Sequence, residues 1–99
     1  MHFLILALRT PDFDPEVLPS HRVYLDALRL RGLLAAHGPF LDQSGGAYVI
    51  RADSLPEAEA VAAADPLSSS GASEMAVWAW EATWIAGAGV DAPDDAEAP

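Results

Sequence analysis

His21 and Asp65, which could transfer a proton together, stand on separate predicted helices. Spacings of three and four place His21 on one helical face with Leu18, Leu25 and Leu28. An imidazole on such a buried face needs a hydrogen-bond partner. Asp65 stands at the C-terminal end of the second helix, where the helix dipole disfavours a carboxylate by about 0.3–1 kcal/mol. A contact between the two side chains would relieve both problems.

A pair of this kind is suited to general acid–base catalysis. The carboxylate would accept one ring N–H and fix the tautomer, which leaves the other ring nitrogen free to carry a proton. Histidine rings ordinarily titrate near neutral pH, as such chemistry requires. The spacing also allows a purely structural role, in which Asp65 is a turn residue before Pro66 and only satisfies an interior histidine. Both interpretations stay open at this point.

Further side chains near the pair are candidates for binding a substrate. Tyr24 and Arg31 follow His21 by three and ten residues and lie near the same helical side. His37, next to Gly38 on a predicted edge strand, faces either a pocket or solvent. We expect Tyr24, His37 and Gly38 to contact the substrate. Helix packing for the tyrosine and solvent exposure for the charged side chains are the commoner alternatives.

Other chemistries lack their sequence motifs. The three histidines show no metal-binding spacing and cysteine is absent, so we expect neither a metal nor a cofactor. Gly45-Gly46 lacks the spacing and the lysine of a phosphate-binding loop and is typical of a hairpin turn. Ser20 adjoins His21, but neighbouring helical residues point apart, which argues against a nucleophilic serine.

The elements that must position the pair follow from the periodicity. Strands are predicted over residues 2–8, 33–40, 47–52 and 74–84. A first helix starts at Pro15 or at Ser20 and ends at Gly32, and a second covers residues 55–64. The order strand, helix, strand, strand, helix, strand predicts an α+β, ferredoxin-like βαββαβ fold, a four-stranded antiparallel sheet with both helices on one face.

Composition restricts the domain count and the partners. Ninety-nine residues, 52% of them hydrophobic, allow one folded domain, which we place over residues 1–85, with a disordered acidic tail over 86–99. The net charge of −10 argues against nucleic acid and anionic membranes as partners. The apolar stretch over residues 3–8 is too short for a signal peptide or a membrane span, and the absence of cysteine fits the cytoplasm.

Two helices leave one face of the predicted sheet uncovered, although the strands are apolar on both sides. Phe3 and Ile5 alternate with Leu4 and Leu6 in the first strand, and Trp78 and Trp80 alternate with smaller residues in the last. A monomer would expose a larger apolar patch than soluble monomers usually tolerate. We therefore expect a homodimer through the open face, unless the tryptophans point toward the helices.

Four short motifs occur in a particular order: residues 20–25 (SHRVYL), Gly38-Pro39, Gly45-Gly46, and residues 64–66 (ADP) followed by Gly71. Together, over about residues 1–82, they resemble the YciI-like (YCII-related) proteins. The resemblance implies a dimeric α/β barrel of ferredoxin-like protomers, with a cleft whose His–Asp pair is proposed to be catalytic. That pair corresponds to His21 and Asp65. Activity known in the family includes elimination of halide from hydroxylated aromatic rings.

Two residues depart from the family pattern. Leu67 stands where an aromatic residue often follows the Asp-Pro pair, and His37 stands where a small apolar residue is more usual. Either change would alter the pocket. Our first hypothesis is a small cytoplasmic enzyme, a cofactor-independent lyase or isomerase, in which His21 oriented by Asp65 acts on a compact aromatic or carbonyl-bearing molecule. The alternative is a non-catalytic dimer that binds a metabolite or a protein, with the pair only joining two helices.

Overall fold

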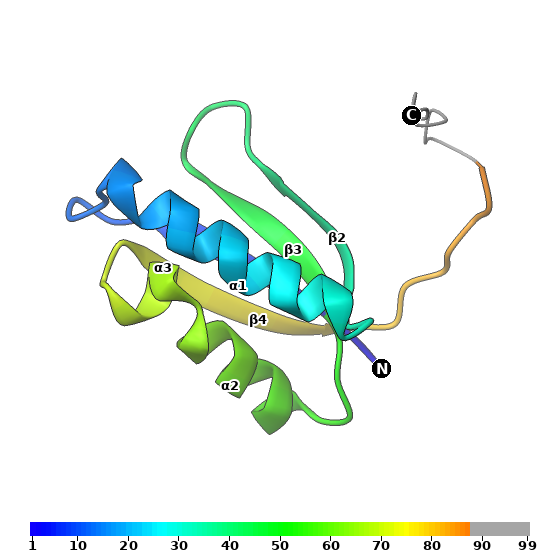
Figure 1. The fold of residues 1–99 in the computed structure, drawn as a ribbon. Coiled ribbons are helices and arrows are strands. Elements are labelled where there is room, and N and C mark those ends of the chain that lie inside the picture. The colour runs from blue at the N-terminus through cyan, green and yellow to red at the C-terminus, as the bar shows by residue number, and fades with distance from the viewer. Residues whose placement is uncertain (88–99) are drawn as a thin grey trace.

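A computed structural model of the chain describes residues 1–87 (Figure 1). The predicted acidic tail lies, from residue 88 onward, outside the described residues. The elements in chain order are β1 (His2–Arg9), the 3₁₀ turn η1 (Pro15–Val17), α1 (Leu18–Leu30), β2 (Leu34–Pro39), β3 (Gly45–Arg51), α2 (Leu55–Ala64), α3 (Pro66–Ser69) and β4 (Ser73–Trp80).

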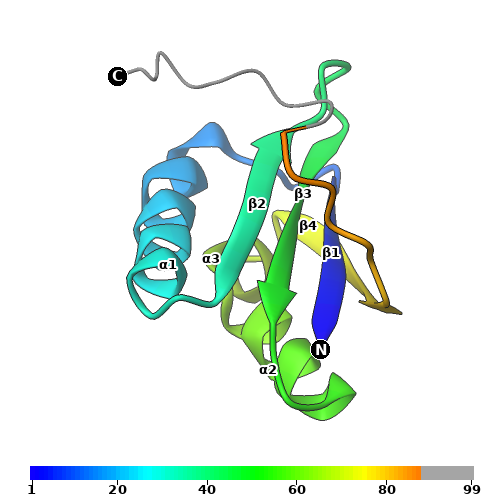
Figure 2. The ribbon, with the colours of Figure 1, turned by 90° about the vertical axis from the view of Figure 1, so that its right-hand side faces the viewer.

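The four strands form one antiparallel sheet in the order β2-β3-β1-β4. All three α-helices lie on the same side of this sheet (Figures 1 and 2). This is the predicted ferredoxin-like α+β arrangement. The added piece is α3, a single helical turn in a stretch for which the sequence had indicated only a loop.

Alternation along β1 determines which residues face the helices. Phe3 and Ile5 are fully buried and pack in the core with Leu25 and Leu28 of α1. The antiparallel register places Tyr48 of β3 opposite Ile5, so the Tyr48 side chain also points to the helical side. The strand periodicity therefore places the Tyr48 hydroxyl in the layer between the sheet and the helices.

The other face of the sheet carries the tryptophans of β4. Trp78 lies opposite Leu4, and Trp80 lies opposite His2, so both indoles point away from the helices. Trp78 is 61% exposed. The alternative in which these rings pack against the helices is therefore wrong, and the face that the sequence left without a cover is indeed apolar.

The last strand is shorter than the sequence predicted. β4 ends at Trp80 rather than at residue 84, because its ladder partner β1 begins at His2, directly opposite Trp80. With no strand residue left to pair, the chain turns. The Trp84 ring then lies edge-on to the His2 ring, with centroids 5.2 Å apart, and 6.2 Å from the Trp80 ring.

The start of α1 falls between the two positions that the sequence left open. Asp14 caps the preceding 3₁₀ turn by accepting a hydrogen bond from the Glu16 N–H, and α1 itself begins at Leu18. Pro19 is tolerated there because the first helical N–H groups have no intrahelical acceptor. The helix therefore holds His21 one turn from its N-terminus.

Candidate active site

Asp65 is the buried centre of the site. Its side chain is 0% exposed, and the residue both ends α2 and caps α3, where its Oδ1 accepts a hydrogen bond from the Leu67 N–H at 2.9 Å. The sequence signal for α3 was the Asp-Pro pair, since Asp is a favoured cap and Pro66 a favoured first helical residue. This cap places the carboxylate at the positive end of α3.

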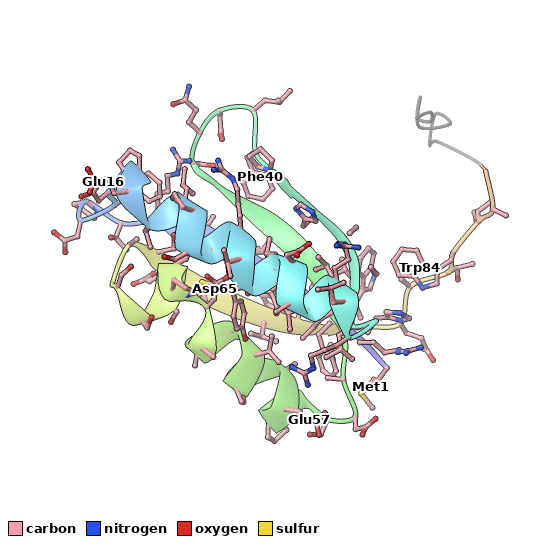
Figure 3. The ribbon with its side chains drawn as sticks, in the orientation of Figure 1. Met1, Glu16, Phe40, Glu57, Asp65 and Trp84 are labelled. Atoms are coloured by element: carbon pink, nitrogen blue, oxygen red, sulfur yellow. The ribbon has the colours of Figure 1, made fainter. Side chains whose placement is uncertain are left out.

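His21 meets this carboxylate from α1. Its Nδ1 lies 2.9 Å from Asp65 Oδ1 and 3.0 Å from Oδ2. A carboxylate offers only acceptors, so Nδ1 carries a hydrogen, and in the neutral form of the ring the lone pair is then on Nε2. Within residues 1–87, no protein group hydrogen-bonds Nε2. The structure thus brings together the two residues that the sequence singled out, 44 positions apart (Figure 3 labels Asp65 beside α1).

Tyr48 is a third member of the cluster, which the sequence analysis did not single out. Its buried hydroxyl donates to Asp65 Oδ2 at 2.9 Å. Burial, reinforced by the negative charge of Asp65, raises the pKa of the Tyr48 phenol well above its usual range. The hydroxyl therefore stays protonated and remains a donor. Asp65 accordingly receives three donors, one from each of α1, β3 and the backbone of α3.

A cavity of about 420 Å³ lies between α1 and the β2–β3 side of the sheet. Its lining includes His21 and Tyr48, while Asp65 stays behind them. The side chain of His21 is 15% exposed, so the ring is shielded yet reachable. The apolar wall is formed chiefly by Phe13, Leu18, Leu25, Leu34 and Leu67. A largely apolar pocket with a few convergent polar groups is the usual form of a small-molecule site.

The other sequence-predicted residues divide into two groups. His37 and Gly38 of β2 line the cavity, and His37 lies opposite Tyr48 in the ladder. Tyr24 does not line it, because its hydroxyl donates to the Val61 carbonyl of α2 at 2.7 Å and so joins the two helices. Arg31 is also absent from the lining. Tyr24 and Arg31 are therefore not part of the cavity lining.

Two adjacent glycines contribute to the lining of the cavity. Gly45 and Gly46, which begin β3, both line it. A Cβ on Gly46 would lie 2.7 Å from the Gly38 carbonyl oxygen, too close for any larger residue without a backbone shift. The close approach of β2 and β3 here explains why the predicted turn motif also belongs to the site.

Two further properties of residues 1–87 concern metals and membranes. In this part of the chain, no three His, Asp or Glu side chains gather closely enough to bind a metal ion. No helix there combines the length and the apolar character that crossing a bilayer requires.

Fold and site together define a ferredoxin-like α+β protein with a buried carboxylate–imidazole pair beside a small-molecule-sized cavity. The sequence profile of the YCII-related domain matches residues 1–81, and the chain belongs to this family. A relative from Bacillus subtilis (strain 168), the uncharacterized protein YjpA, is 46% identical over 79 residues, which cover 80% of this chain and 93% of that protein. The resemblance seen in the sequence is confirmed.

A solved structure has the same fold. It is 5-chloro-2-hydroxyhydroquinone dehydrochlorinase (TftG) from Burkholderia phenoliruptrix AC1100, in complex with 2,5-dihydroxybenzoquinone. The two structures superpose with a TM-score of 0.69 at 23% sequence identity, and the match covers 82% of this chain and 94% of that one. At this level of identity the likeness establishes the fold.

Proposed function

We propose that the protein is a cofactor-independent enzyme of the lyase or isomerase type, in which His21 is the general acid–base and Asp65 orients it. The substrate is a compact aromatic or carbonyl-bearing molecule that occupies the cavity between α1 and β2–β3. His37 and Gly38 contribute to its binding. We expect the enzyme to work in the cytoplasm.

One observation carries this proposal, the contact of His21 Nδ1 with both carboxylate oxygens of Asp65 while the same ring lines the cavity. Because Nδ1 is engaged by the carboxylate and the ring lines the cavity, Nε2 is the ring nitrogen left to act on a molecule bound there. Asp65 supports a rise in positive charge on the ring when Nε2 takes a proton, because a buried carboxylate at hydrogen-bonding distance stabilises an imidazolium.

The chemistry that this geometry supports is proton abstraction. His21 Nε2 takes a proton from a carbon or a hydroxyl of the substrate, and the electron pair of the broken bond moves into the substrate. In an elimination, that pair forms a new double bond as a leaving group departs with its own bonding electrons. In an isomerisation, the imidazolium returns the proton to another atom. The dehydrochlorinase name of TftG supports the elimination form.

The first experiment is a turnover assay on a panel of hydroxylated aromatic and carbonyl compounds, with 5-chloro-2-hydroxyhydroquinone included and chloride release as one readout. We expect the wild-type protein to convert at least one compound. His21→Gln, which keeps a polar side chain of similar reach, should bind that compound while turnover falls about 10²–10⁴-fold. Full activity of His21→Gln would refute the role of the ring.

The alternative is a non-catalytic module that binds a metabolite or a protein. One observation favours it: the His21–Asp65 bond joins α1 to the start of α3 and so has structural value by itself. If joining the helices is the whole role of this bond, His21→Gln should lower the stability as much as the loss of another bond between helices does. It should then leave any turnover unchanged. Tyr24→Phe, which also removes a bond between helices, is the matched comparison for stability.

We further propose that two copies associate through the open face of the sheet. Trp78 and Trp80 are exposed there, opposite Leu4 and His2 of β1 in the ladder. Burying one large apolar side chain contributes about 1.5–3 kcal/mol, so covering several of them favours association. The sedimentation coefficient of the purified protein tests this assembly.

A further inference from the structure

Arginine is concentrated around the cavity in a chain that is otherwise strongly acidic. Five arginines are its only fixed cations, against fifteen carboxylates and a net charge of −10. Three of the five, Arg9, Arg22 and Arg29, line the cavity. Only one carboxylate, Asp26, is found in that lining. In the lining, cationic side chains therefore outnumber carboxylates, the reverse of the protein as a whole.

One of these arginines is neutralised by its neighbour. Arg29 donates from Nε and Nη2 to Asp26 Oδ1, at 3.0 and 2.8 Å, and both side chains are more than half exposed. Arg9 and Arg22 have no carboxylate partner among residues 1–87. They belong to different elements, Arg9 to the end of β1 and Arg22 to α1. Two unpaired positive charges thus remain for a ligand.

Arg9 is held in place before any ligand arrives. Its position in β1 puts its side chain on the helical side of the sheet, and its guanidinium carbon lies 4.0 Å from the centroid of the Phe13 ring. A guanidinium stacked on an aromatic ring keeps its edge N–H groups free, and these fit the two oxygens of a carboxylate or an enolate. The same Phe13 ring contributes to the apolar wall.

We infer that the ligand of this cavity is a small organic anion with an apolar, ring-sized body. This inference rests on the proposed function and adds the substrate class to it. Arg9 and Arg22 contact the charged group, and the leucines and Phe13 of the wall contact the body. Against the negative potential of the whole protein, the local cations let the cavity select an anion over a neutral molecule of the same shape.

The test compares benzoate with benzamide, which share a ring but differ in charge, by NMR titration or calorimetry. We expect benzoate to bind the wild-type protein at least about tenfold more tightly, and Arg9→Gln and Arg22→Gln each to weaken benzoate about tenfold or more with little effect on benzamide. Arg51→Gln, which removes a cation outside the cavity, should leave both affinities unchanged. Arg22→Lys should restore part of the lost affinity.

Equal affinity for the two ligands, benzoate binding that survives both Gln variants, or no binding of benzoate at all would overturn the inference. Circular dichroism checks that Arg9→Gln, which loses a stacking contact, still folds, and the exposed Arg22 gives an independent variant if it does not. The outcome separates from that of the proposed function. Selective anion binding by a wild-type protein that converts no compound of the panel would refute catalysis and leave this inference standing, whereas turnover with equal affinity for benzoate and benzamide would refute this inference alone.

Discussion

The hydroxyl of Tyr48 and the Asp65 carboxylate lie 2.9 Å apart, joined by a hydrogen bond from the sheet to the junction of α2 and α3. His21 contacts the same carboxylate from α1, and the Leu67 N–H of α3 donates to it. Asp65 is therefore fixed by groups on three separate elements, which determines the orientation of the imidazole that it holds. Tyr48 acts as a positioning residue in this arrangement.

Tyr48→Phe removes one donor to Asp65 and leaves the aromatic ring in the core. We expect the free energy of unfolding to fall by about 1–2 kcal/mol, because a buried carboxylate loses one of three donors. Turnover should fall while the KM changes little, since the deleted hydroxyl is bonded to Asp65 and the ring that lines the cavity is kept. Urea denaturation and initial rates check this. Tyr24→Phe is the control, with a similar loss of stability and unchanged turnover.

The raised pKa of Tyr48 predicts a loss of stability in alkali. A tyrosine in the unfolded chain titrates near pH 10, whereas the folded protein keeps the Tyr48 proton to higher pH. Above about pH 10 the folded state therefore binds more protons than the unfolded state, and the free energy of unfolding decreases as pH rises. Below that pH the contribution is complete.

Urea denaturation between about pH 8 and 11 measures this dependence. Tyr48→Phe should flatten the alkaline part of the curve. The free energy of unfolding of Tyr48→Phe should still decrease somewhat with pH in this range, because burial also raises the pKa of Tyr24. An identical alkaline slope in Tyr48→Phe and wild type would contradict the assignment.

Substitutions of Asp65 separate its capping role from its charge. Asp65→Ala leaves the Tyr48 hydroxyl, the His21 Nδ1–H and the Leu67 N–H without their acceptor, and should cost about 3 kcal/mol or more at roughly 1 kcal/mol for each donor. Asp65→Asn keeps an oxygen for the cap and should cost clearly less, yet abolish turnover. Thermal unfolding beside the turnover assay checks both; equal stability of the two variants would argue against the cap.

Charge on the open face should disrupt association. Trp78→Glu places a carboxylate where the two sheets would meet, so we expect sedimentation of this variant as a monomer and of the wild type as a dimer. Val23→Glu is the matched control, because Val23 is 71% exposed on α1, away from that face. A monomeric wild type, or a Trp78→Glu protein that stays dimeric, would refute the proposed interface.

The element order and the His21–Asp65 pair could be predicted from the sequence because each depends on local signals. The leucine spacing determines the buried side of α1, and the Asp-Pro step marks the end of α2. The role of Tyr48 could not be predicted in this way. Strand alternation groups Tyr48 with Ile50, but only the register of β3 against β1 determines that this side faces the helices.

Two other features depended on partners distant in sequence. The end of β4 at Trp80 is determined by where β1 begins, not by its own alternating pattern, which continues to residue 84. The presence of Arg9 and Arg22 at one cavity likewise depends on topology, since Arg9 is the last residue of a strand and Arg22 lies on a helix. Composition shows how few cations the chain has but not where they meet.

The most direct test of the central claim is ¹⁵N NMR of protein labelled at histidine, with the His21 signals assigned by their loss in His21→Gln. We predict that Nδ1 of His21 carries a hydrogen, and that the Nε2 resonance shifts when 2,5-dihydroxybenzoquinone or a substrate found in the panel is added. An Nδ1 that carries no hydrogen in the free protein, or an Nε2 resonance that no bound ligand moves, would contradict an imidazole held by Asp65 for proton transfer to a bound molecule.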